Sequence, residues 1–271
     1  MKKIVLLISI LGFLYSCQDV VDINLDTAAP KLVIDASINW KKGTTGNEQT
    51  IYLTTTTGYY DTSIPVVSGA TVFAKNEANT TYTFIEIPNT GKYVCNNFEP
   101  VLNQTYTLTV IFKGQTYNAT ETLLPVAPIE RLVQNNEGGF TGKNIDVKTY
   151  FLDPAGIDNY YMYKYEYANK IKPEYNVDDD RFFQGNEFFS VTRNRDLKVN
   201  DQFTVTHFGI SKQYYNYMNV LLSITGSNGG APFQSPPATV RGNIINNTNP
   251  SDCALGYFRL SETDSRTYTV Q

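Results

Sequence analysis

The sequence predicts a mainly β protein: an antiparallel sandwich, then a second β-rich domain that carries one helix. Tyrosine (20 residues) and phenylalanine (15) are frequent, and aromatic and β-branched residues favour strands. Short runs of such residues are separated by turn-forming asparagine, glycine and proline. Residues 211–225 differ, because their apolar side chains recur at helical spacing.

Residues 1–16 have the features of a secretory signal peptide. Lys2 and Lys3 precede the apolar run Ile4–Leu14, which is too short to cross a bilayer as a helix, since that takes about 20 residues. The run ends in Leu14-Tyr15-Ser16-Cys17. This ending resembles a lipobox, the motif whose cysteine sulfur accepts a lipid, although Tyr15 is bulkier than usual. We therefore expect Cys17 to become a lipid-modified N-terminus.

Residues 17–29 are predicted to be a tether between the lipid and the folded body. Asp19, Asp22 and Asp26 make this segment acidic. An acidic tract after the lipid cysteine resembles the surface-export signal of Bacteroidota lipoproteins; the alternative is a short solvated linker. We expect an outer-membrane protein that faces the cell exterior or the periplasm. Without residues 1–16 the formal charge changes from −4 to −6, which argues against binding to nucleic acid.

The first β domain is expected over residues 30–124. Apolar and polar residues alternate over Lys31–Trp40, as in a strand with one buried face. About seven such short strands, separated by turns, predict a sandwich. Their sequence pattern resembles that of immunoglobulin-like or transthyretin-like modules. Pro125 and Pro128 then indicate an extended connector over residues 125–129, because proline cannot join a central sheet ladder.

The second β-rich domain is expected over residues 130–271. A helix is predicted over 211–225, with Ser211 as its N-cap. Residues Ile171–Gln184 are polar and predict a surface loop. Five other strands are predicted, namely Ile145–Phe151, Asn159–Tyr167, Gln202–Phe208, Ala254–Leu260 and Thr267–Val270.

Cys95 and Cys253 remain after Cys17 is assigned to the lipid. An oxidising compartment permits a disulfide between them. The alternative is a pair of separate, buried free thiols, and the spacing does not decide between the two.

Several segments along the chain together form a recognisable pattern. The segments, in order, are Pro30–Asp35, Val67–Val72, Leu124–Ile129, Phe151–Pro154, Asn159–Tyr161, Gly230–Phe233, Pro236–Ile244 and Ala254–Phe258. In this order they resemble a family of Bacteroidota lipoproteins, the domain-of-unknown-function family 4249. The resemblance covers nearly the whole mature chain, and its most specific part lies near the end. Members of this family have no established activity, and their genes often neighbour TonB-dependent receptors. The resemblance therefore implies a receptor as partner and maps no catalytic residue.

The residues give no sign of an enzyme, a metal site or a cofactor. His207 is the only histidine, which is a poor basis for a hydrolytic triad or for zinc. Its place in a strand-like run predicts a partly buried structural side chain. Phosphate loops, dinucleotide fingerprints and nucleophile elbows are missing.

Aromatic clusters are the candidate ligand- or partner-binding residues. Tyr161, Tyr163, Tyr165 and Tyr167 share one face of a predicted strand, and tyrosine suits both glycan stacking and protein interfaces. The alternative is a packed sheet face. Phe182 and Phe183 lie in a polar stretch and form a second candidate surface.

These observations lead to two functional expectations. The first is a non-enzymatic outer-membrane lipoprotein, accessory to a TonB-dependent transporter in nutrient capture or uptake. The second is a stand-alone surface lipoprotein that binds a glycan or a peptide. Both place the membrane contact in the lipid on Cys17.

Overall fold

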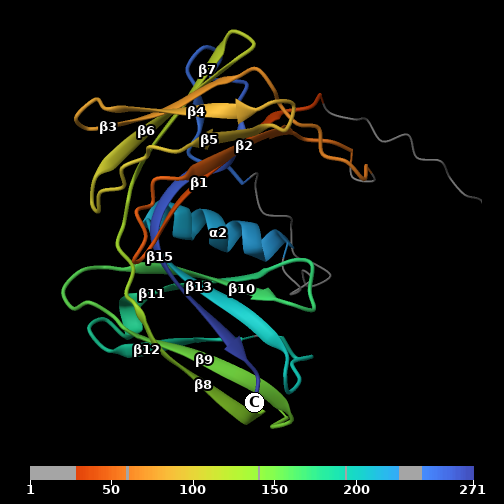
Figure 1. The fold of residues 1–271 in the computed structure, drawn as a ribbon, viewed down its shortest axis with the longest axis vertical. Coiled ribbons are helices and arrows are strands. Elements are labelled where there is room, and N and C mark those ends of the chain that lie inside the picture. Colours follow the sequence, from red (N-terminus) through yellow and green to blue (C-terminus); the bar gives the residue numbers. More distant parts are fainter. Residues whose placement is uncertain (1–28, 59–60, 140, 193, 226–239) are drawn as a thin grey trace, which may run out of the picture.

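The computed structural model of the protein describes residues 29–58, 61–139, 141–192, 194–225 and 240–271. These residues form two β lobes, with a helix between them and a long strand that runs through both (Figure 1). The predicted mainly β fold class is confirmed.

The first lobe, uppermost in Figure 1, is an antiparallel sheet that curls around one core. The alternation predicted for its first strand is confirmed, because Leu32, Ile34, Ala36 and Ile38 are all buried. Its strands are β1 (Leu32–Lys41), β2 (Gln49–Thr55), β3 (Thr71–Asn76), β4 (Thr81–Ile87), β5 (Lys92–Cys95), β6 (Thr105–Phe112) and β7 (Gln115–Thr122).

The second lobe is a sandwich of two sheets around a second core. One layer contains β8 (Ile129–Gly138), β9 (Asn144–Leu152) and β12 (Glu187–Val191); the other contains β10 (Tyr160–Tyr167), β11 (Glu174–Asp179) and β13 (Gln202–Ile210). The loop predicted over Ile171–Gln184 is wrong. This stretch forms β11, which pairs with β10, and the short 3-10 helix η1 (Asp180–Phe182). Its polar composition fits a strand at the edge of a sheet.

Helix α2 (Lys212–Thr225) confirms the helix predicted from spacing. The hydroxyl of Ser211 accepts a hydrogen bond from the Tyr214 backbone N–H at 3.2 Å, so the predicted N-cap is also confirmed. The helix buries Tyr214 and Met218 against Met162, Phe208 and Tyr257 of the large sheet. This is the face of β10 and β13 that points away from the sandwich core.

Strand β15 (Leu255–Thr269) joins the two lobes. Its first half runs parallel to β1, with Ile34 opposite Gly256, and its second half runs antiparallel to β13. The large sheet therefore has twelve strands in the order β11-β10-β13-β15-β1-β2-β5-β4-β3-β6-β7-β14, where β14 is Ile245–Asn246. The predicted second domain, residues 130–271, does not pack as one unit. Its residues Ile244, Ala254, Phe258 and Leu260 belong to the core of the first lobe.

Two carboxylates of β15 bind the connector over residues 125–129. Glu262 accepts a hydrogen bond from the Val126 N–H at 2.9 Å, and Asp264 accepts one from the Ile129 N–H at 2.8 Å. Both carboxylate side chains are buried. The connector is therefore bonded to the strand that crosses both lobes and does not act as a flexible hinge.

Candidate functional site: a groove beside helix α2

The tyrosine row predicted as a binding face is buried, so that prediction is wrong. Tyr161, Tyr163, Tyr165 and Tyr167 are each less than 5% exposed, because the three-stranded sheet covers them. Three of the four hydroxyls have partners inside the lobe: Tyr161 donates to Asp153 at 2.5 Å, Tyr165 to Ser190 at 2.9 Å and Tyr167 to Glu174 at 3.3 Å. Among the described residues the buried Tyr163 hydroxyl has no hydrogen-bond partner. Burial raises the pKa of Tyr161, Tyr163 and Tyr167. The row is packed core, which was the alternative reading.

The two candidate phenylalanines have opposite environments. Phe183 is buried and stacks on Phe188, with ring centroids 3.7 Å apart. Phe182 is 93% exposed on η1. The structure therefore leaves Phe182 as the one accessible member of that pair, and it forms no joint surface with Phe183.

The cysteines and the histidine are structural in the described residues. Cys95 and Cys253 are separate free thiols, as in the second alternative, but only Cys95 is buried and Cys253 is partly exposed. The Cys95 thiol donates to Asn97 at 3.2 Å, and burial raises its pKa. His207 is fully buried and stacks on Tyr163, with ring centroids 4.8 Å apart. Cys17 lies outside the described residues, and none of the described helices is long and apolar enough to span a membrane.

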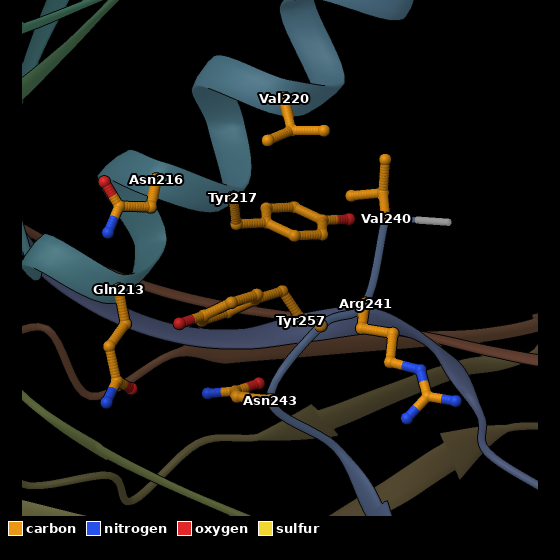
Figure 2. A pocket seen from close by; sticks show the side chains of 9 residues that line it. Gln213, Asn216, Tyr217, Val220, Val240, Arg241, Asn243 and Tyr257 are labelled. Carbon is orange, nitrogen blue, oxygen red and sulfur yellow. The ribbon is translucent and has the colours of Figure 1, made fainter. Parts of the chain in front are cut away.

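A groove of about 440 Å³ lies beside helix α2, at the junction of the two lobes. Figure 2 shows the rings of Tyr217 and Tyr257 projecting into it and amide side chains around them. The lining residues are Gln213, Asn216, Tyr217 and Val220 from α2, the segment Val240–Asn243, and Tyr257 from β15. Ligand sites commonly have this size and often lie between domains.

The segment Val240–Asn243 forms the wall of the groove, and Tyr257 of β15 forms its floor. Two glycines allow the wall to lie directly against the floor. A Cβ on Gly242 would collide with the carbonyl oxygen of Gly256, so only glycine lets the segment 240–243 lie directly on β15. Gly256 itself has a φ of +97°, and a Cβ there would collide with the carbonyl oxygen of Ile34. These residues belong to the segments that carry the family resemblance, and the structure gives them a physical role.

Asn243 holds the wall in place by pairing with the edge of β15. Its amide donates to the Phe258 carbonyl at 2.8 Å, and its side-chain oxygen accepts from the Phe258 N–H at 2.9 Å. The side chain thus satisfies one backbone position as a neighbouring strand would. Ile244, the next residue, is anchored in the core of the first lobe.

We predict that Asn243→Ala lowers the free energy of unfolding by about 1–2 kcal/mol, because it leaves a backbone N–H and C=O without their partner. Urea denaturation measures the loss. Asn247→Ala is the matched control, because Asn247 is exposed, its side chain donates to the half-buried Asn118 side chain, and its backbone N–H donates to the Thr116 carbonyl. An equal midpoint for both variants would contradict the bridging role.

Beneath the groove floor lies a buried polar cluster that ties the helix to both lobes. Ser211 donates its hydroxyl to Glu121 at 2.9 Å, and the Tyr257 hydroxyl lies 3.5 Å from the same carboxylate oxygen. Burial raises the pKa of Glu121, against smaller opposing effects of its hydrogen bonds and of Arg259. Burial also raises the pKa of Tyr257. The floor is therefore held by β7, α2 and β15 together.

The described lining of the groove has aromatic and hydrogen-bonding side chains. Its nine described lining residues include aromatic, amide and guanidinium groups and no carboxylate, thiol or imidazole. In the part of the chain that the structure describes, no cluster of three or more His, Cys, Asp or Glu residues is arranged to hold a metal ion. The groove thus offers hydrogen bonds and ring contacts.

A family model described as "Domain of unknown function (DUF4249)" matches residues 18–267. The chain belongs to this family. The family resemblance predicted from the sequence is therefore confirmed, and the segments that form the wall and floor of the groove lie within the part that DUF4249 covers. No curated protein matches the sequence.

Solved structures with some likeness to the chain contain fibronectin type III domains or cytokine receptors. A two-domain fibronectin type III segment of chicken tenascin has 12% identity and a TM-score of 0.22, covering 66% of this chain and 90% of that one. A cytokine receptor complex has 8% identity and a TM-score of 0.27, covering 68% and 86%. The first three fibronectin domains of chicken CNTN1 have 14% identity and a TM-score of 0.25, covering 67% and 60%. Scores this low carry no functional argument.

Sequence reasoning missed the groove. The helix was predicted, but nothing in its sequence shows that Gln213, Asn216 and Tyr217 face a cavity. The wall comes from Val240–Asn243, and β15 supplies the floor residue Tyr257. The signal available was the resemblance itself, whose most specific segments include Gly242, Asn243 and Tyr257.

Proposed function

We propose that this protein is a non-enzymatic lipoprotein, anchored in the outer membrane through Cys17 and accessory to a TonB-dependent transporter in nutrient capture or uptake. The lipobox-like start supports the anchor, and membership of the DUF4249 family fits the partner that the resemblance implies. The observation that carries the proposal is that one continuous sheet presents both a groove and a separate bare apolar surface. A protein that passes a ligand to a receptor needs two such surfaces.

The bare surface, here called the β4–β5 face, lies on the outer side of the first lobe. Ile85 is 72% exposed, Tyr52 47% and Ile87 44%. A hollow of about 590 Å³ lies over Ile85, Ile87 and Val94. Contiguous exposed apolar groups of this kind mark contact surfaces. We assign the face to the transporter, whose binding would cover these side chains.

The groove and the β4–β5 face lie on the same side of the large sheet. In the strand register Tyr257 is opposite Asp35, Asp35 opposite Tyr52, Tyr52 opposite Lys92, and Lys92 opposite Ile87. Residues paired in this way point to the same side of the sheet. Four strand spacings separate Tyr257 from Ile87, or about 19 Å along the sheet. A ligand in the groove would lie close to a receptor bound on the face.

The test is purification of the tagged protein from detergent-solubilised outer membranes. We predict that a β-barrel receptor is recovered with the wild-type protein and is lost with Ile85→Asp, because the change puts a charge into the contact. Ile245→Asp is the matched control, since Ile245 is 61% exposed on β14, the terminal strand of the sheet, which is four strands away from β4. Cys17→Ser removes the lipid-accepting sulfur but leaves the β4–β5 face intact, so this variant distinguishes loss of the membrane anchor from loss of receptor binding.

Two results would count against the proposal. Recovery of the wild-type protein without any β-barrel receptor would contradict the accessory function. Recovery of equal amounts of receptor with the Ile85→Asp and Ile245→Asp variants would show that the contact does not lie on the β4–β5 face.

The second candidate function is a stand-alone surface lipoprotein that binds a glycan or a peptide. The groove alone favours it, because ligand binding there needs no receptor. A ligand bound by the purified protein, together with a failed receptor recovery, would select this function over the first.

A further inference from the structure

We infer that the groove beside α2 binds a carbohydrate, with Tyr217 as the ring platform and Gln213, Asn216 and Arg241 as the groups that bond sugar hydroxyls. The inference rests on the ligand-capture part of the proposed function and names the class of ligand. It concerns the groove lining of Figure 2 and does not involve the β4–β5 face.

The aromatic part of the groove is a pair of tyrosines at an angle. The Tyr217 and Tyr257 ring centroids are 4.9 Å apart with 48° between the ring planes. Tyr257 is fixed by burial, and Tyr217 is partly exposed above it. An inclined ring of this kind can stack on the C–H face of a sugar, and the phenolic hydroxyl adds a polar contact.

The polar part of the groove is free to bond a ligand. Among the described residues, Gln213, Asn216 and Arg241 make no hydrogen bond or ion pair through their side chains, and all three are exposed. Asn243 differs, because both ends of its amide are occupied by Phe258. Amides both donate and accept, as a sugar hydroxyl requires, and the guanidinium adds several donors.

The same lining argues against the other classes of ligand. A bound peptide is usually recognised through apolar anchors or a free strand edge. The described lining of this groove has only Val220 and Val240 as aliphatic groups, and Asn243 occupies the β15 edge. Nucleic acid needs a basic surface, and Arg241 is the one charged group among the described lining residues. Hydroxyl-rich ligands match the exposed amide, guanidinium and ring groups of the described lining.

The position of the groove adds a reason for specific binding. Its platform is on α2, its floor on β15, and its wall leads into the core of the first lobe through Ile244. The Glu121–Ser211–Tyr257 cluster joins these elements beneath the floor. A site built on elements that are held in place loses little entropy on binding.

The experiment titrates the detergent-solubilised full-length protein with maltohexaose, cellohexaose, xylohexaose and chitohexaose, using isothermal calorimetry. A random peptide pool is the comparison probe. We expect at least one oligosaccharide to bind. Asn216→Ala should then weaken it roughly threefold, as for one lost hydrogen bond. Tyr217→Ala should weaken it about tenfold, which corresponds to about 1.4 kcal/mol.

Asn219→Ala is the control on the same helix. Asn219 is exposed, does not line the groove, and donates its side-chain amide to the Tyr215 carbonyl of its own helix, so its replacement should leave the affinity unchanged. Because Asn216 is exposed as well, Asn216→Ala tests the site even if Tyr217→Ala fails to fold. Circular dichroism checks the fold of each variant.

The outcomes separate the inference from the proposed function. Sugar binding that Asn216→Ala and Asn219→Ala affect equally would overturn the assigned site while leaving ligand capture in place. Peptide binding that Asn216→Ala weakens, without sugar binding, would overturn the ligand class. Absence of binding by every probe, with the receptor still recovered, would overturn the inference and leave the accessory function standing.

Discussion

Asp264→Ala is expected to lower the free energy of unfolding by about 3–5 kcal/mol. The buried Asp264 carboxylate accepts hydrogen bonds from the Ile129 and Ser265 N–H groups, each at 2.8 Å, and from Arg266 at 2.9 Å. Removing it leaves a buried backbone donor of the connector without a partner, which costs more than the bond alone contributes.

Thermal and urea unfolding measure this loss. Asp264→Asn keeps the shape and one acceptor oxygen, so it should fall between the wild-type protein and the alanine variant. Asp252→Ala is the control, because Asp252 is exposed and the bonds given for it are made by its backbone. A loss under about 1 kcal/mol for Asp264→Ala would mean that the carboxylate does not hold the connector.

The second large effect is acid destabilisation through His207. Burial lowers the pKa of this imidazole to about 3, against a smaller opposing effect of the Ala127 backbone. Below pH 6.5 the unfolded chain takes up a proton that the folded protein does not. Stability therefore falls as the pH drops from about 6.5 toward 3, by up to about 1.4 kcal/mol per pH unit.

Between pH 7 and pH 4 this one group should remove about 3 kcal/mol. His207→Phe keeps a ring among Phe151, Tyr161 and Tyr163 and cannot titrate, so its unfolding free energy should fall less steeply. Glu121 acts in the opposite direction, because its raised pKa makes the folded protein bind a proton more tightly as the pH falls. The difference between wild type and variant isolates His207, and parallel curves would contradict the prediction.

Local patterns were sufficient to predict elements whose burial depends on their own sequence. The alternation over Lys31–Trp40 predicted β1, and the helical spacing over 211–225 predicted α2 together with its Ser211 cap. In both cases one face of one element is apolar, and that face is buried. The same logic identified Tyr161–Tyr167 as a strand with four tyrosines on one face.

What covers a face is decided by distant residues, and there the sequence was insufficient. The tyrosine row is buried because β9 and β12 lie over it. The residues of β15 were predicted as two separate strands, Ala254–Leu260 and Thr267–Val270. The polar residues Ser261–Asp264 between them are buried in the continuous strand, and Glu262 and Asp264 bind the connector. The groove was missed for the same reason, since its lining comes from three separate segments.

Strand β15, which runs through both lobes, also determines when the first lobe can finish folding. Its residues pair with β1 across about 220 positions of sequence. The edge of β1 therefore stays uncovered until β15 has been synthesised and has paired with it. Contacts this far apart slow folding, because the intervening loop must close first. Any copy cut short before β15 keeps an open strand edge on β1, the kind of edge that recruits other chains into aggregates. Both lobes therefore depend on β15, and a chain that lacks this strand cannot complete either lobe.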